Sequence, residues 1–294
     1  MDDHIVSRRE ALKTAAVAGI LLPLLGTGRL RADDAAPAAP RLELGLAGYS
    51  MRKLAPDAMI AAMRELGVTH FSAFRTQLPI LLGTPDECRA LAQKYRDAGL
   101  VLTGTGVVTL KNTDADMRRA FECGNAAGLA TMTASYALPP DADALRRTER
   151  FVREYDIRLA FHNHGPEDTI FPSPFDVWKA VQPYDTRLGL CIDVGHAYRA
   201  GADPVAAIRQ CQSRLYDVHM KDTTVGAGVK KDVAALLGRG RLDIVGILSA
   251  LLDIKYPYQV GLEHELDTPD PVPGIAQSYG YMRGAVAALT RGAA

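Results

Sequence analysis

From residue 42 onward, short apolar runs alternate with longer segments in which apolar residues recur at every third or fourth position. Short runs of this kind are typical of buried strands, and the three-and-four spacing is typical of amphipathic helices. Eight strands are predicted, at residues 42–50, 68–74, 100–108, 130–136, 157–165, 187–196, 214–222 and 258–265. Eight helices alternate with them, at residues 57–67, 85–99, 115–128, 141–155, 173–182, 203–212, 242–254 and 274–289.

Eight strand–helix repeats over about 250 residues match the count and length of a closed (β/α)8 TIM barrel. We therefore predict one α/β domain over residues 41–294. An open, doubly wound sheet would usually carry a Gly-rich phosphate loop after its first strand, and the segment "GYSMRKLAP" is not such a loop. Gly67, Gly99 and Gly128 stand where helix C-caps are expected. One longer insertion, residues 223–240, follows the seventh strand, and we expect it to contact substrate together with the loops after the first four strands.

The first forty residues have a different character. A paired arginine, Arg8 and Arg9, precedes Leu12, Lys13 and an apolar run at 14–26 that is too short for a permanent membrane anchor. Small residues suited to cleavage and an Ala/Pro linker follow. This resembles a twin-arginine signal peptide, although Ala is found where that signal usually has Phe. The resemblance implies export of the folded protein to the periplasm, with no stable membrane association after cleavage. A chance Arg-Arg pair in a disordered N-terminus, or an uncleaved and tethered form, remains open.

Composition narrows the classes of partner. The chain has 34 basic and 34 acidic side chains, so no excess of positive charge indicates a nucleic-acid partner. Cys88, Cys123, Cys191 and Cys211 are widely spaced and form no CxxC motif, so we interpret them as small buried side chains. A homo-oligomer is compatible with this composition.

Ionisable residues gather at the ends of four consecutive predicted strands. Side chains alternate between the two faces of a strand, so His162 and His164 share a face opposite to Phe161. The next three strands repeat this pattern, with a bulky apolar face opposed by small and then ionisable residues: Asp193, His219, Lys221, Glu263 and Glu265. In a TIM barrel the C-terminal ends of the strands carry the active site. We therefore predict a barrel that is closed below and polar at its mouth.

Each residue has an ordinary explanation when taken alone. A strand histidine is commonly a hydrogen-bonded core residue, Asp193 and His196 could cap a helix, and the other charges could form ion pairs or be solvated. Taken together, so many buried ionisable groups would carry a severe desolvation cost unless a cation joined them. We predict one divalent metal ion held by His162, Asp193, His219 and Glu263. Mixed nitrogen and oxygen ligands favour Mn²⁺, Zn²⁺, Co²⁺ or Fe²⁺ over Mg²⁺ or Ca²⁺. An octahedral ion with four protein ligands would keep two positions for the oxygens of a sugar.

Three motifs carry a family resemblance. "CIDVGH", "VHMKD" and "GLEHE" are similar to the sixth-strand Asp-x-x-His, the seventh-strand His and the last-strand Glu of the xylose isomerase-like barrel superfamily. The similarity covers roughly residues 42–292, and the superfamily includes sugar isomerases and epimerases, with apurinic endonucleases as relatives. In the epimerases the fifth strand ends in a Glu that binds metal and moves a proton, often within E-N-H-G.

Here "HNHG" puts His162 at that position. The resemblance implies that His162 is a ligand, but a metal-bound imidazole cannot also act as the carboxylate base. Glu263 is then one acid/base candidate. The second partner is open, and the candidates in order of preference are His164, His196, Lys221 and Glu265.

The predicted activity is that of a metal-dependent sugar isomerase or epimerase that abstracts a proton next to a carbonyl, through a metal-stabilised enediolate. Glu263 or His164 would remove the proton, with Lys221 or His196 supporting the oxyanion. Export favours a free, oxidised or glycosidic sugar over a sugar phosphate.

Three alternatives stay open. The first is a lyase that eliminates a group from a keto-glycoside at the same site. The second is a periplasmic sugar-binding barrel without catalytic activity. The third is a hydrolase of the apurinic-endonuclease type, against which the neutral charge weighs.

Overall fold

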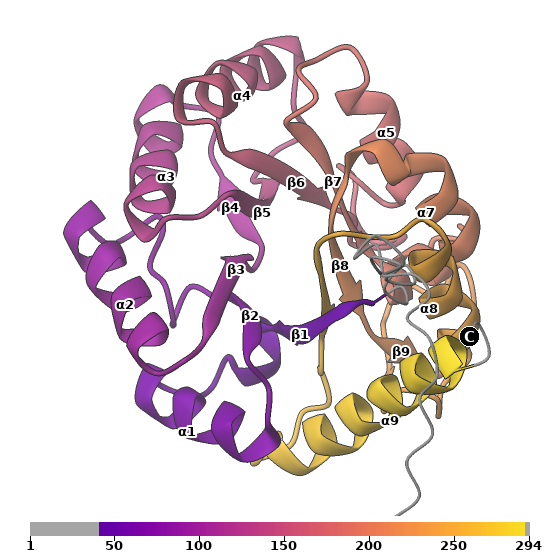
Figure 1. Ribbon diagram of the computed structural model, residues 1–294. Coiled ribbons are helices and arrows are strands. Elements are labelled where there is room, and N and C mark those ends of the chain that lie inside the picture. Colours follow the sequence, from indigo (N-terminus) through magenta and orange to yellow (C-terminus); the bar gives the residue numbers. More distant parts are fainter. Residues whose placement is uncertain (1–40, 292–294) are drawn as a thin grey trace, which may run out of the picture. The chain divides into compact units, whose positions relative to one another are not determined.

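The computed structural model describes residues 41–291, in which nine strands form one parallel sheet rolled into a TIM-like barrel with helices around its outside (Figure 1). The predicted α/β barrel is thereby confirmed, and residues 1–40 with the predicted signal segment lie outside the described part. The barrel strands are β1 (Glu43–Ala47), β2 (His70–Ala73), β3 (Val101–Thr105), β4 (Val108–Leu110), β5 (Thr131–Tyr136), β6 (Arg158–His162), β7 (Leu188–Asp193), β8 (Leu215–Met220) and β11 (Gln259–Leu262). Their order in the sheet is β3-β2-β1-β11-β8-β7-β6-β5-β4.

Helices follow the strands in the predicted alternation. They are α1 (Pro56–Leu66), α2 (Pro85–Asp97), α3 (Asp114–Ala127), α4 (Ala142–Tyr155), α5 (Pro174–Val181), α7 (Pro204–Cys211), α8 (Ile244–Asp253) and α9 (Val272–Arg291). Local sequence explains their ends: Thr84 and Glu87 form a capping box at the start of α2, and left-handed Gly67 and Gly128 end α1 and α3. No helix in the described range 41–291 is long and apolar enough to cross a membrane.

The predicted third strand, residues 100–108, is wrong as a single strand. β3 pairs with β2 and β4 pairs with β5, and the chain changes partner at Gly106 and Val107. The Thr105 hydroxyl bridges this seam, because it accepts a hydrogen bond from the Thr133 N–H (3.0 Å) and donates one to the Thr133 carbonyl (3.2 Å). A side chain therefore replaces ladder hydrogen bonds where the barrel closes.

Strands also end earlier than predicted at the edge that carries the ionisable residues. β6 stops at His162, and the Asn163 side chain bonds both the N–H (3.0 Å) and the carbonyl (3.1 Å) of Asp193. Asp193 in turn ends β7 and caps a short extra helix, α6 (Val194–Arg199), by accepting the His196 N–H at 2.8 Å. At this edge, side-chain hydrogen bonds thus replace the backbone hydrogen bonds of the sheet. The residues that follow the strands lie in loops above the barrel.

The prediction that the barrel is closed below is also wrong. A cavity of about 360 Å³ opens among the N-terminal halves of the strands. Polar side chains line it and bond one another, with Thr103 donating to Gln259 (2.5 Å) and Thr133 donating to Asp217 (2.6 Å). All four cysteines are buried, in agreement with their interpretation as small buried side chains.

The insertion after the seventh strand folds back on itself. Two short strands, β9 (Asp222–Thr223) and β10 (Ala234–Ala235), pair antiparallel within it. The buried Asp222 carboxylate accepts hydrogen bonds from the N–H groups of Gly238 (3.1 Å), Gly240 (2.9 Å) and Leu242 (3.1 Å). One carboxylate therefore holds this loop in shape beside the mouth of the barrel.

Candidate metal and substrate site

Four buried side chains meet at the C-terminal ends of the barrel strands. His162 ends β6, Asp193 ends β7, His219 lies on β8, and Glu263 follows β11 directly. One ligand atom from each residue lies within 4.8 Å of the others, and none of the four side chains is more than 6% exposed. The structure therefore brings together the four residues that the sequence predicts as ligands.

The donor atoms of this group fit a divalent cation. Nε2 of His162 lies 3.2 Å from Nδ1 of His219 and 3.5 Å from Oδ2 of Asp193, and Nδ1 of His219 lies 3.2 Å from Oε1 of Glu263. Two imidazole nitrogens that face each other this closely repel if both present lone pairs, so a cation between them is favourable. Oδ2 of Asp193 is buried and has no aligned hydrogen-bond donor among residues 41–291. These are the features of a ligand set for a divalent transition-series ion such as Zn²⁺, Mn²⁺ or Co²⁺.

Lys221 lies beside this group and is 2% exposed. Its Nζ is 3.0 Å from Asp193, 3.0 Å from Glu263 and 2.7 Å from Glu265. Burial by itself would lower the pKa of Lys221, but the three carboxylates outweigh it and hold the pKa well above its ordinary value. Gly195 makes the close packing feasible, because a Cβ there would lie 2.5 Å from Cγ of Lys221. When Asp193, Glu263 and Glu265 are ionised and the histidines neutral, as in a ligand group, one buried ammonium leaves two formal negative charges, which a divalent ion would balance.

The carboxylates of the group differ in their environments. Burial raises the pKa of Asp193 well above its ordinary value. Burial acts in the same direction on Glu263, but His219 and Lys221 outweigh it and hold the pKa of Glu263 well below its ordinary value. Glu263 is therefore a stable anion, suited to bind a cation and poorly suited to take up a proton at neutral pH.

His219 is supported from inside the barrel. Its Nε2 lies 3.4 Å from Oδ2 of Asp217, and the Thr133 hydroxyl donates to that same oxygen. Burial would lower the pKa of His219, but the carboxylates of Glu263 and Asp217 outweigh it and raise that pKa well above its ordinary value. A carboxylate at Nε2 keeps the second ring nitrogen, Nδ1, directed towards His162 and Glu263.

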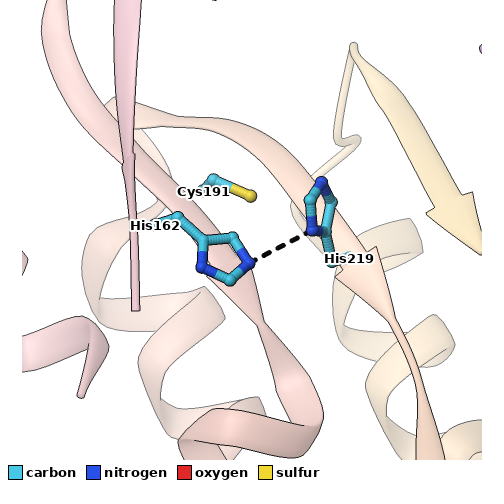
Figure 2. A group of neighbouring side chains, drawn as sticks. All are labelled: His162, Cys191 and His219. Carbon is cyan, nitrogen blue, oxygen red and sulfur yellow. Dashed lines mark hydrogen bonds between the residues drawn. The ribbon is translucent and has the colours of Figure 1, made fainter. Parts of the chain in front are cut away.

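Cys191 gives a second grouping with the two histidines, and Figure 2 shows its sulfur beside the facing rings of His162 and His219. Burial raises the pKa of the Cys191 thiol well above its ordinary value. A protonated thiol is a poor ligand, so the two carboxylates are the better partners for the histidines.

A cavity of about 210 Å³ lies over the ligand group. Its lining residues are Tyr49, Phe74, Val107, His162, His164, His196, Glu263 and Glu265. His164 comes two residues after the end of β6, and its side chain is 35% exposed to this cavity and to solvent. Its Nδ1 lies 3.1 Å from Oδ2 of Asp168. Burial tends to raise the pKa of Asp168, but hydrogen bonds from His164 and from the backbone of Ile170 hold it below its ordinary value. An ionised Asp168 therefore accepts a hydrogen bond from the Nδ1–H of His164, which leaves Nε2 as the acceptor atom of the ring.

His196 lies on the short helix α6 between two cations. Arg199 donates to its Nδ1 at 2.6 Å, and Nζ of Lys221 lies 3.1 Å from its Nε2. Burial, and then the charge of Lys221, lowers the pKa of His196 well below its ordinary value, so the ring is neutral. Arg199 is itself fully buried and also bonds Glu167 (2.6 Å) and the carbonyl of Lys230 (2.7 Å), which ties the loop after β8 to the mouth of the barrel.

All candidate metal ligands and acid/base residues predicted from the sequence thus lie at this mouth. Several residues that support them were not predicted. Asp217 shares its strand face with His219, two positions away, so the alternation that identified His219 also pointed to it. Asp168 follows His164 by four residues in the same loop, where strand alternation gives no signal, and Arg199 bonds Glu167 from another loop.

A family model described as xylose isomerase-like TIM barrel matches residues 60–285 of the chain. Inosose dehydratase of Geobacillus kaustophilus is 25% identical over 155 residues, which make up 48% of this chain and 48% of that protein. The chain therefore aligns with about half the length of this curated relative. A protein named probable endonuclease 4, of Halorhodospira halophila, is 30% identical over 109 residues, which make up 33% of this chain and 36% of that protein.

Solved structures extend the likeness over most of the chain. A xylose isomerase domain protein from Planctomyces limnophilus superposes with a TM-score of 0.68 at 15% identity, covering 86% of this chain and 99% of that one. An L-ribulose 3-epimerase superposes with a TM-score of 0.67 at 14% identity, covering 86% of this chain and 97% of that one. At such identities the likeness concerns the fold.

Proposed function

The chain belongs to the xylose isomerase-like TIM barrel family, and on that premise we propose that it is a divalent-metal-dependent enzyme that removes a proton next to the carbonyl of a sugar or keto-sugar. The observation that carries the proposal is the convergence of His162, Asp193, His219 and Glu263 beneath a cavity that also contains His164. A sugar-binding barrel without catalytic activity would not need a charged, buried ligand group of this kind.

His162, Asp193, His219 and Glu263 would hold the metal ion. A bound divalent ion would supply Lewis-acid polarisation of the carbonyl and adjacent hydroxyl oxygens of the substrate. The protein residues around it bind the sugar, exclude water and move the proton.

His164 is the residue we propose as the general base. Asp168 holds its Nδ1 proton, so Nε2 is the basic atom within the cavity. Glu263 was the first acid/base candidate from sequence, but the low pKa imposed by His219 and Lys221 favours a role as ligand. The proton taken by Nε2 of His164 can return to the neighbouring carbon, which gives isomerisation.

Lys221 and His196 have separate supporting roles. The Lys221 ammonium is charged and lies within the group, so it stabilises negative charge that develops on substrate oxygen. The neutral His196 ring lines the cavity, and because its two nitrogens contact Arg199 and Lys221, it positions these cations beside the substrate.

β-Elimination is the second candidate reaction, because the same proton removal expels a leaving group from the next carbon. Its support is the relative named inosose dehydratase. The location of the protein is also a proposal: the twin-arginine-like segment within residues 1–40 implies a periplasmic enzyme, and hence a free or glycosidic sugar as substrate.

Deuterium exchange tests this proposal. The protein loaded with Zn²⁺ or Co²⁺ is incubated in deuterated water with a panel of ketoses, inososes and 3-keto-glycosides, and incorporation is read by mass spectrometry. We expect exchange at a carbon next to the carbonyl that depends on metal and falls about 10²-fold or more in His164→Gln. The matched control is His70→Gln, a histidine at the opposite end of the barrel.

Two outcomes would contradict the proposal. Stoichiometric metal binding without exchange on any member of the panel would favour the sugar-binding barrel. Metal-dependent cleavage of an abasic-site oligonucleotide would favour the endonuclease alternative.

A further inference from the structure

A second cavity of the barrel mouth, here called the β2–β4 groove, has a chemistry of its own. It encloses about 350 Å³ between the loop after β2 and the β3–β4 segment. Its lining is mostly apolar: Ala73, Leu78, Pro79, Ile80, Leu81, Leu82, Gly106, Val107 and Val108. Leu78 and Ile80 form a buried floor, whereas Leu82 on the rim is 85% exposed. An exposed Leu beside an apolar floor indicates a surface suited to an apolar ligand.

The groove adjoins the cavity over the ligand group. Val107 lines both, and Phe74 of that cavity lies in the chain between Ala73 and Arg75 of the groove. The Phe74 ring packs edge-on against Tyr49, which also lines the cavity over the ligands. A molecule whose reacting part lies above His162 and Glu263 can therefore extend along Phe74 and Val107 into the groove.

The rim of the groove is positively charged. Arg75, Lys111 and Arg119 line it together with one carboxylate, Asp116, which gives a net charge of +2. Oδ2 of Asp116 accepts the backbone N–H of Lys111 (2.7 Å), and Arg119 donates to the Leu81 carbonyl (3.3 Å). Within residues 41–291, none of the three cations has a carboxylate within ion-pair distance. Such cations beside an apolar surface are complementary to a ligand that has an apolar body and a negatively charged group.

We propose that the β2–β4 groove binds the part of the substrate beyond the reacting sugar, and that this part is an apolar ring or chain with an acidic substituent. The proposal rests on the proposed function for the position of the sugar. The chemical class is then an acidic glycoside or keto-glycoside, with its apolar aglycone against Leu78 and Ile80 and its acidic group towards Arg75 and Lys111.

Two sets of probes test the groove. The fluorescent anion 8-anilinonaphthalene-1-sulfonate reports on the groove without any sugar. Three unreactive glucosides, measured by calorimetry on the Zn²⁺-loaded protein, report on the groove and the cavity together: 4-carboxyphenyl, phenyl and methyl β-D-glucopyranoside. The variants are Arg75→Ala/Lys111→Ala and Leu82→Asp, which alter exposed side chains. The control is Lys179→Ala, an exposed lysine on α5.

We expect 8-anilinonaphthalene-1-sulfonate to bind one per chain, and about tenfold more weakly in the double variant and in Leu82→Asp. The 4-carboxyphenyl glucoside should bind more tightly than the phenyl glucoside, and the phenyl more tightly than the methyl. In the double variant the 4-carboxyphenyl and phenyl glucosides should bind equally well, and both should still bind more tightly than the methyl glucoside. Lys179→Ala should change nothing.

Equal affinities of the three glucosides, or equal dye binding by wild type and double variant, would overturn the proposal. These outcomes are separate from failure of the proposed reaction. Charge-dependent dye binding without any C–H exchange would support the groove as a binding site and would contradict the proposed proton-transfer activity.

Discussion

Asp217 lies 3.4 Å from Nε2 of His219, while the other ring nitrogen of that histidine faces His162 and Glu263. Histidine ligands commonly donate their remote N–H to a carboxylate, which fixes the ring and strengthens the ligand. The structure brings the two side chains to ion-pair distance, without an aligned hydrogen bond, because Asp217 and His219 share one face of β8.

Asp217→Asn should weaken divalent metal binding by about 10- to 100-fold, since the amide cannot hold the Nε2 proton as a carboxylate does. Competition with a chromophoric chelator measures the Zn²⁺ affinity. Thr103→Val is the matched control, because that hydroxyl bonds Gln259 inside the same barrel and does not contact His219. Equal affinities of Asp217→Asn and wild type would show that His219 needs no carboxylate partner.

Asp168→Asn should lower kcat by about 10²-fold or more and leave Zn²⁺ affinity unchanged. The carboxylate holds Nδ1 of His164 (3.1 Å), and an amide there no longer fixes Nε2 as the basic atom. Steady-state kinetics and metal titration on the same preparation separate these effects. Asp270→Asn, in an exposed loop, serves as control. Parallel losses of turnover and metal affinity would instead place Asp168 among the supports of the metal site.

Lys221→Met should destabilise the metal-free protein by about 3–5 kcal/mol, because it leaves the buried carboxylates of Asp193 and Glu263 without their cation. Saturating Zn²⁺ should restore much of this loss, since a divalent ion supplies the missing positive charge. Urea denaturation with and without metal gives both values. Lys53→Met is the control, because it removes an exposed pair with Asp267 and should have little effect on stability. Equal stabilities of the two metal-free variants would contradict the inference that Lys221 balances the charge of the buried carboxylates.

Alternation along strands is why so much of the site could be predicted from sequence. His162, Asp193, His219 and Glu263 come from strand ends that a parallel barrel necessarily brings together. Their side chains needed only the correct face, which the alternation of apolar and ionisable residues supplies. The fold followed from the same regularity, as strand and helix repeated eight times.

What sequence could not supply depends on contacts between distant segments. The break between β3 and β4 comes with a bridge from Thr105 to Thr133, and neither residue shows this in its local pattern. The sequence left Glu263 and His164 both open as the base, and it did not show the surroundings of Glu263. Its pKa depends on His219 and Lys221 from the neighbouring strand, and the carboxylate type alone does not reveal those charges.

A surface carboxylate between helix α5 and strand β7 gives a test of pH dependence away from the site. Asp185 accepts hydrogen bonds from the Arg187 N–H (2.9 Å), the Arg187 guanidinium (3.1 Å) and the Arg153 guanidinium (2.9 Å). Partial burial raises its pKa, but these donors outweigh it and lower the pKa below the ordinary value of 3.8. Because the folded pKa lies below the unfolded one, this contribution to stability is present above about pH 4 and is lost as pH falls through the folded pKa.

Asp185→Asn should therefore cost about 1 kcal/mol at neutral pH, and the difference from wild type should narrow between about pH 5 and pH 3. Urea denaturation across this range measures it. Asp253→Asn, in an exposed pair with Arg209, is the control and should have little effect at any pH. A difference that stayed constant down to pH 3 would mean that the shape of the Asp185 side chain matters and its charge does not.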